Sequence, residues 1–147
     1  MNREQQLEKL LHEEIPLTTA IGIQVKYYDH ASLTLLAPLA NNINHKCTAF
    51  GGSLYAVAVL SGWGLLHLRL AEQGLHGHIV IQESSVKYLK PVTTDIEATA
   101  TLATTQNFER FVKLFQRKGM ARIEIESRVM QRGQVALEFT GNFVVHS

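Results

Sequence analysis

The chain has 147 residues, of which 46% are hydrophobic and 18% are charged, a composition typical of one soluble globular domain with a sizeable core. Fourteen lysines and arginines against thirteen acidic residues give a formal net charge of +1, so we expect no nucleic-acid partner. Cys47 is the only cysteine, which excludes an intrachain disulfide and favours a reducing cytoplasm. The polar N-terminus lacks the apolar segment of a secretory signal.

The N-terminal third predicts one helix followed by two strands. Residues 3–14 carry leucines at helical spacing among polar residues, which is typical of an amphipathic helix. Pro16 ends this helix, because the residue before a proline avoids the helical conformation. Residues 21–28 and 31–37 are short β-type runs joined by an Asp-His turn, and residues 38–48 form an Asn-rich loop.

Residues 53–72 predict a long helix that is apolar on nearly all sides. A membrane-spanning helix needs about 20 mostly apolar residues. The uninterrupted run at 54–66 is shorter, contains Ser61 and two glycines, and is followed closely by Arg69. We therefore expect no membrane span but a buried core helix about 30 Å long.

The C-terminal half predicts four more strands and a short helix. The strands are expected at residues 78–89, 93–103, 121–130 and 135–145. Aromatic and aliphatic residues at i, i+3, i+4 and i+7 predict an amphipathic helix over residues 107–118. An all-round apolar helix needs a surface that wraps it, and a curved antiparallel sheet can do so. The expected class is therefore α+β.

In this order of elements the sequence resembles the hotdog-fold thioesterases. An N-x-x-x-T-x-x-G-G pattern places Asn44, Thr48, Gly51 and Gly52 just before the central helix, and S-V-K-Y-L-K-P-V occupies residues 85–92. The resemblance covers nearly the whole chain, residues 1–147, and is to the YiiD C-terminal type. It implies a hotdog fold, in which a curved antiparallel sheet wraps one long central helix, with protomers assembled as a homodimer or a dimer of dimers. In longer relatives a GNAT acetyltransferase domain precedes this domain, and 147 residues leave no room for one.

The Gly-Gly pair at the start of the central helix is the first candidate site. A helix N-terminus leaves backbone N–H groups unpaired, and glycines let a ligand oxygen approach them. Thioester hydrolysis passes through an oxyanion, so Gly51 and Gly52 are predicted to form an oxyanion hole, with Asn44 or His45 directing the attacking water. In the alternative interpretation the glycines only permit tight packing of the helix, His45 bonds to backbone, and Thr48 braces the loop.

The sequence departs from the family at the catalytic acid. Many hotdog thioesterases carry Asp or Glu on the central helix two turns after the Gly-Gly, and residues 56–61 contain neither. Phe50 stands where relatives often have His. Glu83 is a candidate replacement, but strict strand alternation turns it away from the helix unless a bulge intervenes. Ser53 and Ser61 are neutral alternatives that could only position water. The predicted substrate-binding residues are Thr48, Phe50, Ser53, Ser61, Glu83 and Ser85.

The sequence is compatible with three functions. The first is an acyl-thioester hydrolase acting on acyl-CoA or acyl-carrier protein, and the second is a non-catalytic acyl-thioester binding or sensor domain that lacks the base. The third, a hotdog dehydratase, needs a histidine paired with an acid on the central helix, and this acid is missing. A dyad of His45 and Cys47 is disfavoured because adjacency in sequence does not set geometry. No cofactor or metal is expected, since His76 and His78 lack a third ligand.

Overall fold

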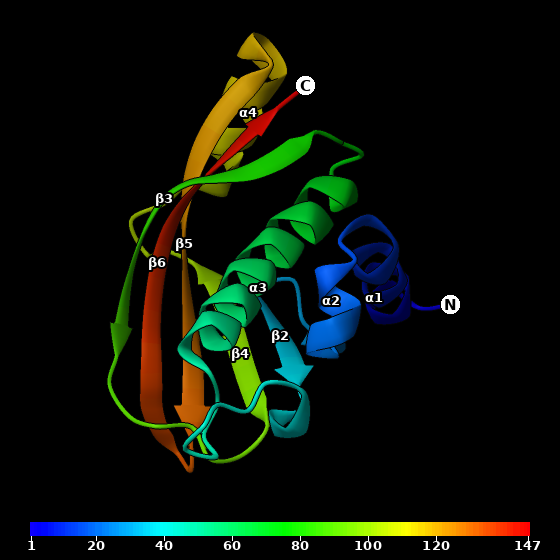
Figure 1. The fold of residues 1–147 in the computed structure, drawn as a ribbon. Helices are drawn as coiled ribbons and strands as arrows, with labels where there is room; N and C mark the ends of the chain where they lie inside the picture. The colour runs from blue at the N-terminus through cyan, green and yellow to red at the C-terminus, as the bar shows by residue number, and fades with distance from the viewer.

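Six strands form one antiparallel sheet that curves around a long helix in the computed structural model, which describes residues 1–147 (Figure 1). The strands are β1 (Gln24–Tyr28), β2 (Ser32–Ala37), β3 (His78–Tyr88), β4 (Ile96–Leu102), β5 (Met120–Gln131) and β6 (Gln134–His146). The helices are α1 (Arg3–Glu14), α2 (Leu17–Ile21), α3 (Gly51–Glu72) and α4 (Phe108–Lys118), with a 3-10 turn η1 at Leu39–Asn41. The order across the sheet is β1-β2-β4-β5-β6-β3. The expected α+β arrangement, a sheet around one central helix, is confirmed.

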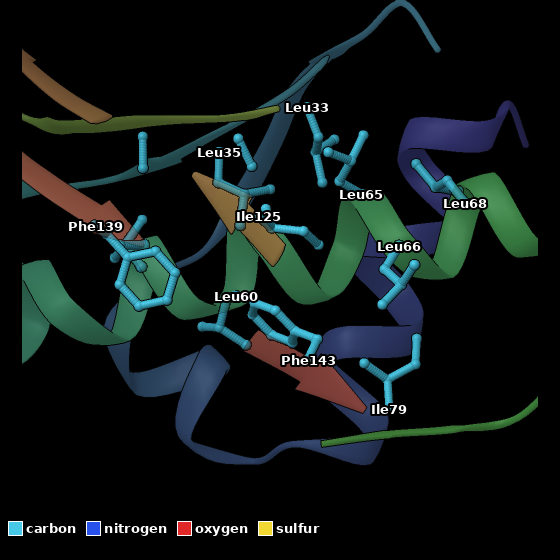
Figure 2. Packing of buried hydrophobic residues seen from close by; sticks show 14 of the residues in the cluster. Leu33, Leu35, Leu60, Leu65, Leu66, Leu68, Ile79, Ile125, Phe139 and Phe143 are labelled. Carbon is cyan, nitrogen blue, oxygen red and sulfur yellow. The ribbon is translucent and has the colours of Figure 1, made fainter. Parts of the chain in front are cut away.

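Helix α3 forms the centre of the hydrophobic core. Its leucines interdigitate with side chains from the sheet, including Leu33, Ile125 and Phe143 (Figure 2). Two glycines inside the helix allow this close approach: a Cβ on Gly62 would lie 2.9 Å from the Phe143 ring, and one on Gly64 would lie 2.6 Å from Leu33. The helix is long and apolar enough to cross a membrane by composition alone, but most of its apolar stretch is buried inside the protein. The prediction of a buried core helix is therefore confirmed.

Some element boundaries differ from the predicted ones. The strand expected over 21–28 begins only at Gln24, because Ile21 belongs to α2, which Gly22 ends in the left-handed conformation with φ 80°. The strand expected from residue 93 begins at Ile96. The side chain of Gln131 explains this delay, since it hydrogen-bonds to the backbone N–H and the hydroxyl of Thr93 and to the Thr94 hydroxyl. These residues therefore do not join the strand.

The two edges of the sheet are covered very differently. On the β1 edge, α1 packs alongside, and the Glu8 carboxylate accepts a hydrogen bond of 2.8 Å from the Val25 backbone N–H. Strand β3 forms the other edge, is 11 residues long, and pairs only with β6. A register shift between Ile81 and Glu83 marks a bulge in this strand. In Figure 1, α1 and α2 lie on the side of α3 away from β3, which leaves the β3 edge open.

Candidate functional site

The loop before α3 is organised by the side chain of Asn44. Its Oδ1 accepts hydrogen bonds from the backbone N–H groups of Lys46, at 2.8 Å, and Thr48, at 3.1 Å. Its Nδ2 donates to the Thr48 hydroxyl at 2.9 Å. Asn and Thr commonly fold a loop back on itself through such local bonds. Asn44 and Thr48 therefore give this loop its shape.

Backbone hydrogen bonds then fix where α3 begins. The Ala49 N–H donates to the Val92 carbonyl at 2.8 Å, and the Phe50 N–H donates to the Asn42 carbonyl at 2.7 Å. The Asn42 side chain is itself buried and donates to the Pro38 carbonyl at 2.8 Å. The start of the helix is thus tied to the loop after β3 and to the end of β2.

The first turn of α3 holds three backbone donors without partners. The helix begins at Gly51, two residues earlier than predicted, with Phe50 as its N-cap and no side-chain cap. Its first internal hydrogen bond runs from the Leu54 N–H to the Phe50 carbonyl. The N–H groups of Gly51, Gly52 and Ser53 make no hydrogen bond, and no acidic residue lies in this turn to compete for them. Because a helix N-terminus also carries partial positive charge, this turn is suited to bind a carbonyl oxygen or an oxyanion.

Two aromatic rings flank these donors. A Cβ on Gly52 would lie 2.5 Å from the Phe50 ring, and a Cβ on Gly51 would lie 3.4 Å from the Tyr88 ring. The Tyr88 hydroxyl donates to the Gly51 carbonyl at 3.0 Å. Phe50 and Tyr88 are 57% and 55% exposed, which is unusual for large apolar side chains. Both rings therefore lie close to the first turn of α3 and expose apolar surface beside it.

The structure brings residues of β3 to the helix that the sequence did not single out. The Tyr55 hydroxyl and the Ser84 hydroxyl are 2.6 Å apart, one turn further along α3. Ser84 faces the helix, as do Val86 and Tyr88, whereas Ser85 and Glu83 alternate with them and are exposed. The bulge therefore does not turn Glu83 toward the helix.

The remaining predicted site residues lie in different environments. His45 and Cys47 are exposed on the loop, and the His45 ring makes no hydrogen bond. Ser53 is partly exposed in the first turn of α3. Ser61 is fully buried, where its hydroxyl donates to the Ala58 carbonyl at 2.7 Å and contacts the Ser127 hydroxyl at 2.8 Å.

No carboxylate lies on α3 near its N-terminus. The only acidic residue of this helix is Glu72, at its last position. Its carboxylate bonds to the Tyr28 hydroxyl, the His30 ring and the Arg3 guanidinium. No group of three or more His, Cys, Asp or Glu side chains is arranged to hold a metal ion. The protomer thus offers backbone donors at this end of α3 without the acid that many hotdog thioesterases use.

Comparison with solved structures defines the class of protein. A protein of unknown function from Chlorobaculum tepidum TLS is 31% identical, with a TM-score of 0.92 over 98% of this chain and 94% of that one. A protein from Shewanella oneidensis described as a "putative thioesterase" is 28% identical, with a TM-score of 0.89 over 98% and 97% of the two chains. A thioesterase from Haemophilus influenzae shares the fold at 15% identity, with a TM-score of 0.73 over 99% and 92%. The fold is that of the hotdog thioesterases.

The family follows from the sequence. The family described as "Putative thioesterase (yiiD_Cterm)" matches residues 4–147, and the chain belongs to this family. The resemblance inferred from the Asn-Thr-Gly-Gly pattern is thereby confirmed.

Proposed function

We propose that the protein hydrolyses acyl thioesters of CoA or of an acyl-carrier protein at the N-terminal end of α3. The observation that carries this proposal is the set of three unpaired backbone N–H groups at Gly51, Gly52 and Ser53. They lie in the turn where the family pattern predicts the oxyanion hole. Membership of a thioesterase family supports the reaction type.

The chemistry at this site is a simple addition and elimination. The thioester carbonyl oxygen accepts hydrogen bonds from the Gly51 and Gly52 N–H groups while a water adds to the carbonyl carbon. These donors stabilise the negative charge that develops on this oxygen. Removing one such donor typically raises the activation free energy by about 3 kcal/mol. The C–S bond then breaks, giving a carboxylic acid and a thiol. His45 is the proposed acceptor of the water's proton, and Ser53 a proposed hydrogen-bond partner of the water.

The aromatic residues would bind the organic part of the substrate. Phe50 and Tyr88 expose their rings close to Gly52 and Gly51, so the acyl chain or the pantetheine arm can pack against them. Asn44 and Thr48 act through the loop that they brace, by holding His45 and the helix start in place. The exposed Cys47, with no partner cysteine, fits a reducing cytoplasm.

We also propose that the protein acts as a homodimer paired through β3. A long edge strand whose outer side has no partner strand can pair with a second copy. Beside it, α3 presents a stripe of partly buried residues at a spacing of four, namely Tyr55, Val59, Trp63 and His67. A second copy would cover both features and place the candidate site at the interface.

The missing carboxylate supports a second candidate function, a non-catalytic acyl-thioester binding domain. Such a domain would keep the donors of Gly51 and Gly52 and the aromatic walls but lack a base. The two functions differ in turnover and not in binding, so one experiment separates them.

The experiment measures thiol release from acyl-CoAs of increasing chain length and from acyl-carrier protein. We expect turnover by the wild-type protein and a kcat/KM that is about tenfold to a thousandfold lower for His45→Ala, the range for a lost polar contact in the transition state. Lys46→Ala, a neighbouring exposed loop residue, is the matched control and should match the wild type. Equal turnover by His45→Ala and wild type would refute the role of His45. Binding of acyl-CoA without hydrolysis of any substrate would establish the binding domain instead.

A further inference from the structure

Helix α4 carries a cationic face whose lysines and arginines form no salt bridge. Arg110, Lys113, Arg117 and Lys118 are all exposed, and none of them takes part in a salt bridge. Glu109 is the only carboxylate of the helix. These four cations and one anion give α4 a charge of +3, so the ten other cations and twelve other anions leave the rest of the chain at −2. The excess of positive over negative charge in the protein therefore lies on one helix of 11 residues.

The fold holds this face outward. The opposite side of α4 buries Phe111, Val112 and Phe115. Three of the cations recur at i, i+3 and i+7 and therefore share one face of the helix. Together with Asn107, Glu109 and Leu114 they line a single surface hollow, in which three cations outnumber one carboxylate. The helix is thus a firmly packed support for a row of positive charges.

The position of α4 separates this face from the candidate site of the same protomer. The Arg69 guanidinium, near the end of α3, packs over the Phe108 ring of α4 at 4.3 Å from the ring centre. Arg69 follows Gly51 by 18 residues of helix, a distance of about 27 Å at 1.5 Å per residue. In the proposed antiparallel pairing of β3 with its copy, however, the His78 end of one strand meets the Tyr88 end of the other. The α4 end of one protomer then approaches the start of α3 in its partner.

We propose that the cationic face of α4 docks the acidic surface of an acyl-carrier protein whose thioester enters the site of the partner protomer. This inference rests on the proposed function and selects the carrier-bound substrate within it. A protein-borne thioester needs a recognition surface beyond the reacting carbonyl, and carboxylates along an acidic helix recur at the same spacing as the cations of α4. The remaining chain has a net charge of −2, which disfavours a nucleic-acid partner because nucleic-acid binding requires many contacts to phosphates.

The test is a binding titration of fluorescently labelled holo-acyl-carrier protein, followed by anisotropy at low salt. It compares wild type with the double variant Lys113→Glu/Arg117→Glu and with the matched control Arg128→Glu/Arg132→Glu, which makes the same charge change on exposed residues of β5 and its turn. We expect at least a tenfold weaker Kd for the α4 variant and a change within twofold for the control. Lys113→Arg/Arg117→Lys should bind as wild type does. Thermal unfolding checks that all variants are folded.

Each other outcome separates the docking proposal from the proposed function. Equal affinity of wild type and the α4 variant, equal weakening by both charge reversals, or no binding of the carrier by wild type would overturn the docking proposal. Loss of acyl-CoA affinity in the α4 variant would assign this face to the CoA phosphates and would also overturn it. Binding of the carrier that depends on α4, without thiol release from any substrate, would leave docking in place while hydrolysis fails.

Discussion

At the scale of single residues, Asn44 acts through the loop that it holds together. Three hydrogen bonds connect its amide to Lys46 and Thr48, and α3 starts three residues after Thr48. The family pattern places an asparagine at this position, and the structure gives a physical reason for one, since its amide supplies both the acceptor oxygen and the donor nitrogen that the loop uses.

Asn44→Ala should therefore affect both stability and turnover. Each lost hydrogen bond contributes about 0.5–1.5 kcal/mol, and the site is partly exposed, so we expect a decrease of about 1–3 kcal/mol in the free energy of unfolding. The kcat/KM for thioesters should fall because the loop no longer fixes His45 and the helix start. Urea unfolding and thiol release measure the two effects. Asn44→Asp, which keeps the acceptor oxygen, should retain more stability, and an alanine variant as stable and active as wild type would refute this role.

The sequence pattern locates one side of the candidate site and misses the other. Asn44, Thr48, Gly51 and Gly52 are close in sequence, so their grouping follows from the chain itself. Tyr88 and Ser84 reach the site from a strand that is about 30 residues away in the sequence, so only the folded sheet brings them to the start of α3.

At the scale of elements, a polar cluster joins three segments at the C-terminal end of α3. The Glu72 carboxylate bonds to Tyr28 and His30, which lie at the end of β1 and in the turn after it, and to Arg3 at the start of α1. Burial raises the pKa of Glu72, but the hydrogen bonds from Tyr28 and His30 outweigh it and hold the pKa below its ordinary value of 4.5. The positive charges of His30 and Arg3 act in the same direction.

Glu72→Gln should remove the pH-dependent contribution of this cluster to the free energy of unfolding of the protein. Because the pKa of Glu72 is lower in the folded state than in the unfolded state, its stabilisation is fully present above pH 4.5 and is lost as the pH falls through the folded-state pKa. We expect the variant to lose about 1 kcal/mol at pH 7 and to approach wild-type stability at more acidic pH. Urea unfolding at several pH values measures this difference. The control Glu97→Gln, which breaks only an exposed pair with Lys26, should change stability by less than about 0.5 kcal/mol. A difference that stays constant with pH would contradict the assignment.

Most elements are predictable from the sequence, because each has a clear period. The central helix and α4 follow their apolar patterns, and the Asn107 side chain caps α4 by accepting a hydrogen bond from the Arg110 N–H at 3.0 Å. Helix α2 was missed because five residues are too few to show a helical period. The late start of β4 was missed because the Gln131 side chain of β5 forms hydrogen bonds with Thr93 and Thr94, and the sequence does not show this contact.

At the scale of the whole molecule, the open β3 edge and the stripe on α3 predict a dimer. Trp63 and His67 stack with ring centres 5.2 Å apart, and burial lowers the pKa of His67, with the charge of His76 acting in the same direction. The stripe is therefore uncharged at neutral pH and suited to an interface with a second copy.

Val59→Glu should separate the protomers, because it places a charge in the middle of this stripe. We expect wild type to sediment at twice the mass of the chain and the variant to sediment at the mass of one chain. Val59→Ala, which removes apolar area without adding charge, should weaken the dimer less. Since the candidate site would lie at the interface, the glutamate variant should also lose thioester turnover. A wild-type protein that is monomeric at micromolar concentration would refute the pairing.

In the proposed function the thioester oxygen accepts hydrogen bonds from the N–H groups of Gly51 and Gly52, with the unpaired Ser53 N–H next to them in the same turn. The amide proton shifts of these residues report such a bond directly. They are to be measured during titration with an acyl-CoA analogue in which a methylene replaces the sulfur and the carbonyl remains, and with an alkyl-CoA thioether that lacks the carbonyl. We predict downfield shifts of these amide protons with the carbonyl analogue and much smaller shifts with the thioether. Equal shifts with both ligands, or binding that leaves these three amides unchanged, would contradict the claim.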